Sequence, residues 1–147
     1  MKKQKEIKSK NVFFIKSIEI LSFSINSKEK PLPEQLTFKF NVRLEFKTND
    51  DLNYLYLITH IDIENVDLSI MVGQLSVSCI FQIENISKKI KIKDNHSIDI
   101  PTELLEELIE VSVSTTRGVM FSTFKGTFLH NAVLPIMDVK QFVPLNK

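Results

Sequence analysis

The sequence predicts an α+β fold, in which a four-stranded antiparallel β-meander comes first and one long C-terminal helix packs on one face of the sheet. In the first 85 residues, apolar and polar residues alternate along several segments, as in strands with one buried face. Apolar residues then recur at helical spacing between 101 and 126. A chain of 147 residues, 43% hydrophobic and 25% charged, suits one soluble domain with a substantial core.

The domain organisation follows from composition. Residues 1–11 are expected to be a disordered basic tail, because the first ten residues contain five Lys and one Glu. Residues 12–147 then form a single domain, with the sheet in 12–85, the helix in 101–126 and a C-terminal loop in 127–147. Removing the five Lys and one Glu from totals of 19 basic and 18 acidic residues leaves 14 and 17. The body of the protein is therefore not expected to bind nucleic acid.

The first strand is predicted in residues 12–26. Ile18 and Ile20 share one face, whereas the apolar residues from Leu21 onward have the opposite parity. A β-bulge between Ile20 and Leu21 would produce this change. Residues 28–33 are predicted to be a loop, because two closely spaced prolines do not fit a central strand.

The second strand, in residues 36–47, has the most regular pattern of the chain. Its period of two predicts one apolar face and one face in water. The alternating apolar residues are Leu36, Phe38, Phe40, Val42, Leu44 and Phe46. Residues 54–64 and 67–84 are predicted as the third and fourth strands, with a bulge or kink at Gly73, where the apolar parity changes. Because short turns join consecutive strands, we expect a meander.

The long helix is expected to begin at Pro101. Proline suits the first turn, because a backbone N–H at that position would have no hydrogen-bond partner within the helix. An apolar stripe at helical spacing follows, and Gly126 is the expected stop. The stripe begins with Leu104, Leu105, Leu108 and Ile109. A strand in 110–116 is an alternative that the pattern leaves open, since small and β-branched residues lower helix propensity there. Asp138 is expected to cap one further turn.

No motif for catalysis or cofactor binding stands out. His60, His96 and His130 lie far apart, and Cys79 is the only cysteine, so we expect no metal, no cofactor and no disulfide. Three glycines cannot build a phosphate loop. A Ser/His/Asp arrangement stays open, but there is no nucleophile elbow. We therefore expect no enzymatic activity. Without a signal peptide or spanning segment, we predict a cytoplasmic protein that does not insert in membranes.

Apolar residues are more abundant than a small core requires. The chain has eleven Phe, and the predicted loop after Gly126 is apolar at Phe128 and Leu129. Surplus apolar surface indicates a subunit interface or a groove for apolar ligands.

Several of these features together resemble the SecB-like family of export chaperones. After four strands and a helix come Arg117, then Gly126, Thr127 and Phe128 at the helix end, then Leu134 with Pro135, and finally Phe142. The resemblance covers roughly residues 16–143. It implies a sheet with helix packing on one face, and a dimer that pairs again into a homotetramer.

The resemblance also implies a function. Members of this family are ATP-independent holdase chaperones that bind non-native polypeptides in apolar grooves. Some serve protein export through a translocase motor, and others are dedicated chaperones of an antitoxin in toxin–antitoxin systems. Because the chain ends at Lys147, soon after Asp138, and shows no motor-binding tail, we expect unknown or dedicated clients rather than generic export. A domain that binds a small apolar ligand or lipid is an alternative, and an enzyme of unrecognised type is another.

Candidate site residues follow from these expectations. The predicted client contacts are Phe38, Phe40, Phe128, Leu129 and Phe142. For Phe38 and Phe40, ordinary core packing is an equally good interpretation. The predicted subunit interface consists of Ser112, Ser114, Thr115 and Arg117. Arg117 is expected to be a buried ion-pair partner across that interface, with an anion-binding role as the alternative.

Overall fold

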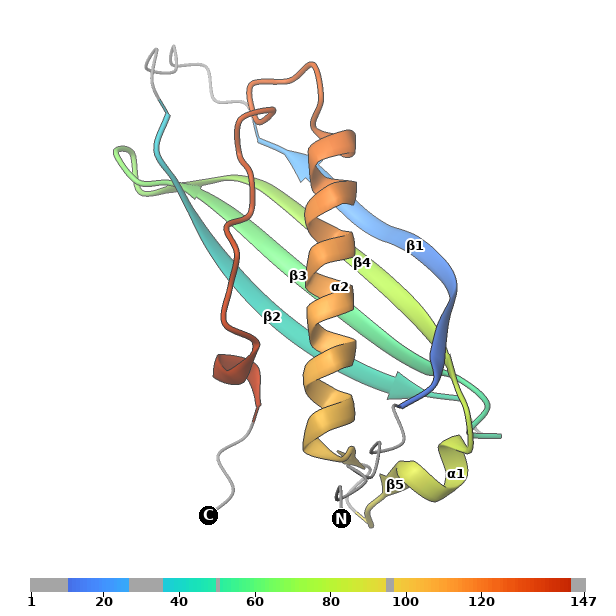
Figure 1. Cartoon of the computed structure of the whole chain (residues 1–147). Helices are drawn as coiled ribbons and strands as arrows, with labels where there is room; N and C mark the ends of the chain where they lie inside the picture. Colours follow the sequence, from blue (N-terminus) through green and yellow to red (C-terminus); the bar gives the residue numbers. More distant parts are fainter. Residues whose placement is uncertain (1–10, 27–35, 50, 95–96, 144–147) are drawn as a thin grey trace, which may run out of the picture.

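The computed structural model shows one antiparallel sheet of four long strands with one long helix against it, so the predicted α+β fold is confirmed (Figure 1). The structure describes residues 11–26, 36–49, 51–94 and 97–143. The expected tail apart from residue 11, the loop at 28–33 and His96 lie outside the described residues.

The order of the strands corrects the predicted meander. The strands are β1 (Phe13–Ile25), β2 (Phe38–Thr48), β3 (Leu55–Asn65) and β4 (Ile70–Ile83). They lie in the order β1-β4-β3-β2, so β1 pairs with β4 and not with β2, as in a Greek key. β4 buries apolar side chains on both faces, Ile80 on one and Val77 on the other. A strand that is apolar on both faces is typical of the interior of a sheet, where it has a neighbouring strand on each edge. β1 is the second neighbour of β4.

β1 contains two bulges. Its register against β4 shifts between Ile15 and Ser17 and again between Ile20 and Ser22, so Lys16 and Leu21 have no partner on β4. The second bulge confirms the one predicted from the change of parity. Together the bulges bring the apolar residues on either side of them onto one face of the sheet. That face is the one on which the helix lies.

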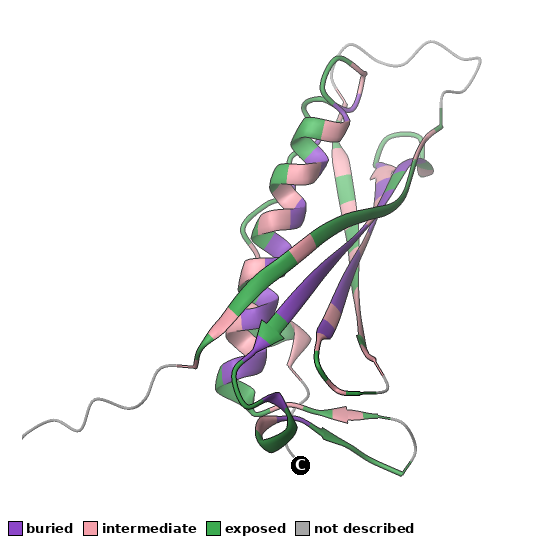
Figure 2. Ribbon diagram, turned by 90° about the vertical axis from the view of Figure 1, so that its right-hand side faces the viewer, coloured by how far each residue is buried: buried purple, intermediate pink, exposed green. Residues whose placement is uncertain are grey.

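The long helix α2 (Thr102–Thr123) begins directly after Pro101 and ends just before Gly126, which has a φ of 81°. The helix therefore confirms the helical interpretation of 110–116. Its buried side chains pack mainly on β3 and β4. In Figure 2 the buried residues lie where the helix faces the middle of the sheet, whereas much of β1 is exposed. The helix thus packs mainly on the two central strands, while β1 is largely exposed and the helix side of β2 is half-buried.

Between β4 and α2, the chain forms the short helix α1 (Ile86–Lys89) and a small hairpin of β5 (Lys91–Ile92) with β6 (Ile98–Asp99). After α2, the chain turns back alongside the helix and ends its described part with the 3₁₀ turn η1 (Val139–Phe142). Asp138 accepts a hydrogen bond from the Lys140 backbone N–H at 3.0 Å, as the predicted cap requires.

Gly73 allows this returning chain to approach the sheet. The register of β3 against β4 shifts beside Gly73, which confirms the predicted irregularity. A Cβ atom at Gly73 would lie 2.6 Å from the Leu129 side chain. Leu129 is therefore seated on β4 because this position has no side chain.

Candidate functional site

The first exposed apolar surface lies on β1. We call Ile15, Ile18, Ile20 and Phe23 the β1 strip. They pair with core-facing residues of β4, so they face the helix side of the sheet, yet 40%, 45%, 48% and 56% of their respective surfaces are exposed. β1 is also an edge strand, with one row of backbone groups unpaired by the sheet. An exposed apolar edge of this length is an aggregation hazard unless a partner covers it.

The second surface lies on the other edge strand. Five residues of β2 face the helix side and are half-buried; we call them the β2 face. They are Phe38, Phe40, Val42, Leu44 and Phe46. At one end of this strand, Phe46 and Phe142 line a hollow of about 350 Å³ together with Leu105 of α2 and Ile98 of β6. A hollow of this size accepts one or two apolar side chains.

The structure brings together some of the predicted client residues. Phe38, Phe40 and Phe142 lie on or beside the β2 face, and each is half-buried. Phe128 is half-buried, whereas Leu129 is completely buried against β4 and offers no surface. Phe46 was not among the predicted residues, although it has the same parity in the same strand. Strand parity was therefore the signal that could have found it.

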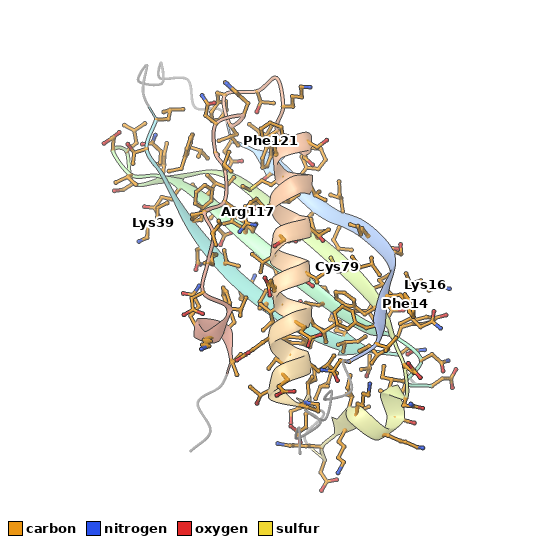
Figure 3. All side chains as sticks on the ribbon, in the orientation of Figure 1. Phe14, Lys16, Lys39, Cys79, Arg117 and Phe121 are labelled. Carbon is orange, nitrogen blue, oxygen red and sulfur yellow. The ribbon has the colours of Figure 1, made fainter. Side chains whose placement is uncertain are left out.

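The predicted interface residues on α2 fall into different environments. Ser112 is completely buried under the helix in its own protomer, Ser114 is exposed, and Thr115 is half-buried. Arg117 does not meet a carboxylate among the described residues. Its Nε donates to the Leu134 carbonyl oxygen at 2.7 Å, and its Nη2 donates to the Pro135 carbonyl at 2.9 Å. Figure 3 shows Arg117 reaching from α2 toward the returning chain.

The opposite face of the sheet, which faces water, carries a network of polar side chains. His60 lies between Ser76 and Glu45, with Nδ1 2.7 Å from Ser76 Oγ and Nε2 2.9 Å from Glu45 Oε2. The hydrogen bond from His60 is the largest cause that lowers the pKa of Glu45 below its usual value, and Lys47 at 3.3 Å adds to it. Because an ionised carboxylate only accepts, Nε2 carries a proton and donates to Glu45.

This Ser76–His60–Glu45 row has the distances of a hydrolase triad, and the sequence alone could not find it, since the three residues come from different strands. Its setting differs from that of a triad. Ser76 lies in β4, which is paired on both edges, so nearby backbone N–H groups serve the sheet and cannot form an oxyanion hole. We interpret the row as a cross-strand bridge that links β2, β3 and β4.

Other chemical sites are weak in the described part of the chain. No group of three His, Cys, Asp or Glu side chains there is placed to hold a metal ion. Burial raises the pKa of the Cys79 thiol, which therefore reacts poorly as a nucleophile. Among the described helices, none is long and apolar enough to cross a membrane.

The order of the elements, with a β1-β4-β3-β2 sheet and one long helix on one face, is the fold of SecB-like chaperones. A solved structure with this fold is the SecB-like chaperone Rv1957 of Mycobacterium tuberculosis, in complex with a ChAD peptide from the Rv1956 HigA1 antitoxin. The match covers 86% of this chain and 90% of that chain, with a TM-score of 0.55 and 10% sequence identity. No family model matches the chain, and no curated protein is significantly similar in sequence.

Proposed function

We propose that this protein is an ATP-independent holdase chaperone that binds extended apolar segments of non-native polypeptides. The observation that carries the proposal is the apolar surface on both edge strands, which is exposed on β1 and half-buried on β2. The fold is that of a chaperone solved with a bound peptide, which supports the same class of ligand here. We place the protein in the cytoplasm as part of this proposal, since its single cysteine is buried and unpaired.

The two surfaces suit different partners. The β1 strip belongs to an edge strand that a second copy of the chain can extend by antiparallel pairing about a two-fold axis. Such pairing covers the strip in both copies and gives a dimer, and a dimer of dimers can follow through the exposed side of α2, where Ser114 lies. Ser112 has no exposed surface, so it takes no part in this proposed interface.

The β2 face suits the client. Its aromatic residues are half-buried, it continues into the hollow beside Phe142, and β2 is the other edge strand of the sheet. An extended peptide can add main-chain hydrogen bonds to such an edge while its side chains enter apolar hollows. Phe38, Phe40 and Phe128 are the proposed client contacts, and Phe142 lines the hollow at the end of the β2 face. Leu129 is left out of the proposed contacts, because it is completely buried against β4.

Two kinds of client are compatible with the proposed chaperone function. Handing clients to an export motor is one role. Dedicated chaperoning of an antitoxin is the second, and it is favoured by the antitoxin peptide bound to the structural neighbour. A specific, stable complex with one antitoxin, without binding to unrelated unfolded proteins, would identify the dedicated role.

Aggregation of a chemically denatured, unrelated protein tests the proposal, followed by light scattering during dilution into buffer. The wild-type protein should suppress aggregation at substoichiometric amounts. Phe40→Ala should weaken suppression because it removes an aromatic ring from the β2 face, whereas Phe14→Ala should not, because Phe14 lies on the opposite face of the sheet. Absence of suppression, together with no specific partner in a pull-down, would refute the chaperone proposal. A monomer that copurifies with a small apolar ligand would favour the ligand-binding alternative instead.

A further inference from the structure

The β2 face is partly covered by the end of the protein's own chain. We call residues 134–143 the C-terminal strap. The strap runs back along α2 on the side of β2 (Figure 1), and η1 within it contacts α2. Phe142 and Val143 of the strap line the same hollow as Phe46 of β2. The surface proposed for an extended client is therefore beside, and in part under, an extended segment of the same protein.

The strap is held by very few backbone interactions. In the described structure, its backbone–backbone hydrogen bonds are local ones within η1, from Gln141 to Asp138 and from Val143 to Lys140. Its backbone is tied to α2 only by the two hydrogen bonds that Arg117 donates to consecutive carbonyl groups. A strand inside a sheet would instead use a ladder of such bonds. One side chain thus supplies the polar attachment of the strap.

The apolar attachment is also limited. Leu134 is almost completely buried, but Ile136 is 93% exposed, and the remaining apolar residues of the strap are half-buried. A second hollow, of about 390 Å³, lies between the strap and α2 and is lined by Arg117, Ser114 and Met137 among others. Interiors of proteins are usually close-packed. The strap therefore lies over its site without filling it.

We propose that the C-terminal strap is a displaceable occupant of the client site, held by Arg117 and Leu134, and that an extended apolar segment of a client replaces it. This inference rests on the proposed function. The replacement is chemically equivalent: the client offers an apolar side chain in place of Leu134 and two successive carbonyl groups to Arg117. Because the strap and the client exclude each other, any change that weakens the strap strengthens client binding.

Native-state proteolysis combined with peptide binding tests this. Trypsin cleaves after Lys140 only when the strap has opened locally, so the cleavage rate reports the open population. Cleavage after Lys125, which lies outside the strap, serves as the internal reference. The probe is a synthetic fluorescent peptide of alternating Phe, Leu and Ser, which contains no trypsin site. Its binding is measured by anisotropy.

A saturating amount of peptide should raise cleavage after Lys140 in the wild-type protein by about ten-fold, relative to Lys125. Without peptide, Leu134→Ala should raise the same cleavage by roughly ten-fold or more and tighten peptide binding to a similar extent. Arg117→Met should also raise cleavage by roughly ten-fold, because two charge-assisted hydrogen bonds are lost. Circular dichroism checks that both variants remain folded, and either variant alone is sufficient for the cleavage test.

The outcomes separate the two proposals. If neither the wild-type protein nor Leu134→Ala binds the peptide and the pull-down finds no specific partner, the proposed chaperone function is refuted. If the wild-type protein binds it but cleavage after Lys140 slows, the strap is part of the client site and not its competitor. That result, or Arg117→Met cleaved no faster than wild type, would overturn the strap inference and leave the chaperone function standing.

Discussion

Replacing Phe23 with Ala should break self-association while leaving the protomer folded. Phe23 lies at one end of the β1 strip, on the helix side of the sheet, and more than half of its surface is exposed. If a second copy covers the strip, Phe23 loses its contact with water in the dimer. The substitution then removes apolar area from the interface and leaves the core unchanged.

The magnitude follows from the exposed area of Phe23. The residue exposes 56% of its surface, which for a side chain that can bury about 200 Å² is about 110 Å². Burying this area contributes about 2.8 kcal/mol per protomer, at about 25 cal/mol per Å². A two-fold interface contains the contact twice, and Ala retains only the β-carbon. We therefore expect a loss of roughly 3–4 kcal/mol in dimerisation free energy, or about 10²–10³ in Kd.

Sedimentation velocity over a dilution series measures this Kd, and thermal unfolding at low concentration checks the protomer. Phe14→Ala is the matched control: the same residue in the same strand, 62% exposed, but on the water-facing side (Figure 3). Equal weakening by both substitutions would refute the assignment of the β1 strip to the interface. A wild-type protein that stays monomeric at high concentration would refute the self-association itself.

Four further outcomes concern stability, measured by urea unfolding. Gly73→Ala should destabilise the folded protein by about 1–3 kcal/mol, because the new Cβ meets a leucine side chain at 2.6 Å. Gly118→Ala should stabilise the folded protein by up to about 1 kcal/mol, because the new Cβ enters open space on the helix. Thr59→Val should stabilise by about 1 kcal/mol, since its buried hydroxyl has no partner among the described residues. His60 lowers the pKa of Glu45 in the folded state. The hydrogen bond between them therefore stabilises the folded protein above about pH 4.5, and this stabilisation is lost as the pH falls further. Glu45→Gln should therefore remove less than about 0.5 kcal/mol at pH 7 and nothing at pH 3, because Glu45 is well exposed.

Features that depend on one segment of the chain were predicted correctly from its local sequence pattern. The alternation in β2 predicted which of its residues face the helix, and Phe46 belonged to that pattern even though it was not named. The bulge at Leu21 and the irregularity beside Gly73 followed from changes of parity. Pro101 and Gly126 correctly predicted the two ends of the helix. The fixed φ of Pro and the ability of Gly to adopt a positive φ are properties of the residue itself.

Relations between distant segments were harder to predict. The parity of β1 is equally compatible with pairing to β2 or to β4, so only the long-range contact decides that β1 lies beside β4. The same limit applies to the Ser76–His60–Glu45 row, whose members belong to three strands. For Arg117, the sequence predicted an ion pair across a subunit interface; within one chain, its side chain donates to two carbonyl groups. A guanidinium group can donate to a carboxylate or to carbonyl oxygens, and the packing of the chain decides which of these lies within reach.

The sequence by itself therefore determined the elements of this protein: four strands, their apolar faces, one long helix and where that helix begins and ends. These depend on periods of two and 3.6 residues and on the backbone preferences of Pro and Gly, which are local properties. The order of the strands, the exposure of each edge strand and the hydrogen-bond partners of Arg117 arise only in the folded chain. Those features arise when segments far apart in the chain compete to cover the same apolar surface, and a local pattern contains no record of which segment wins.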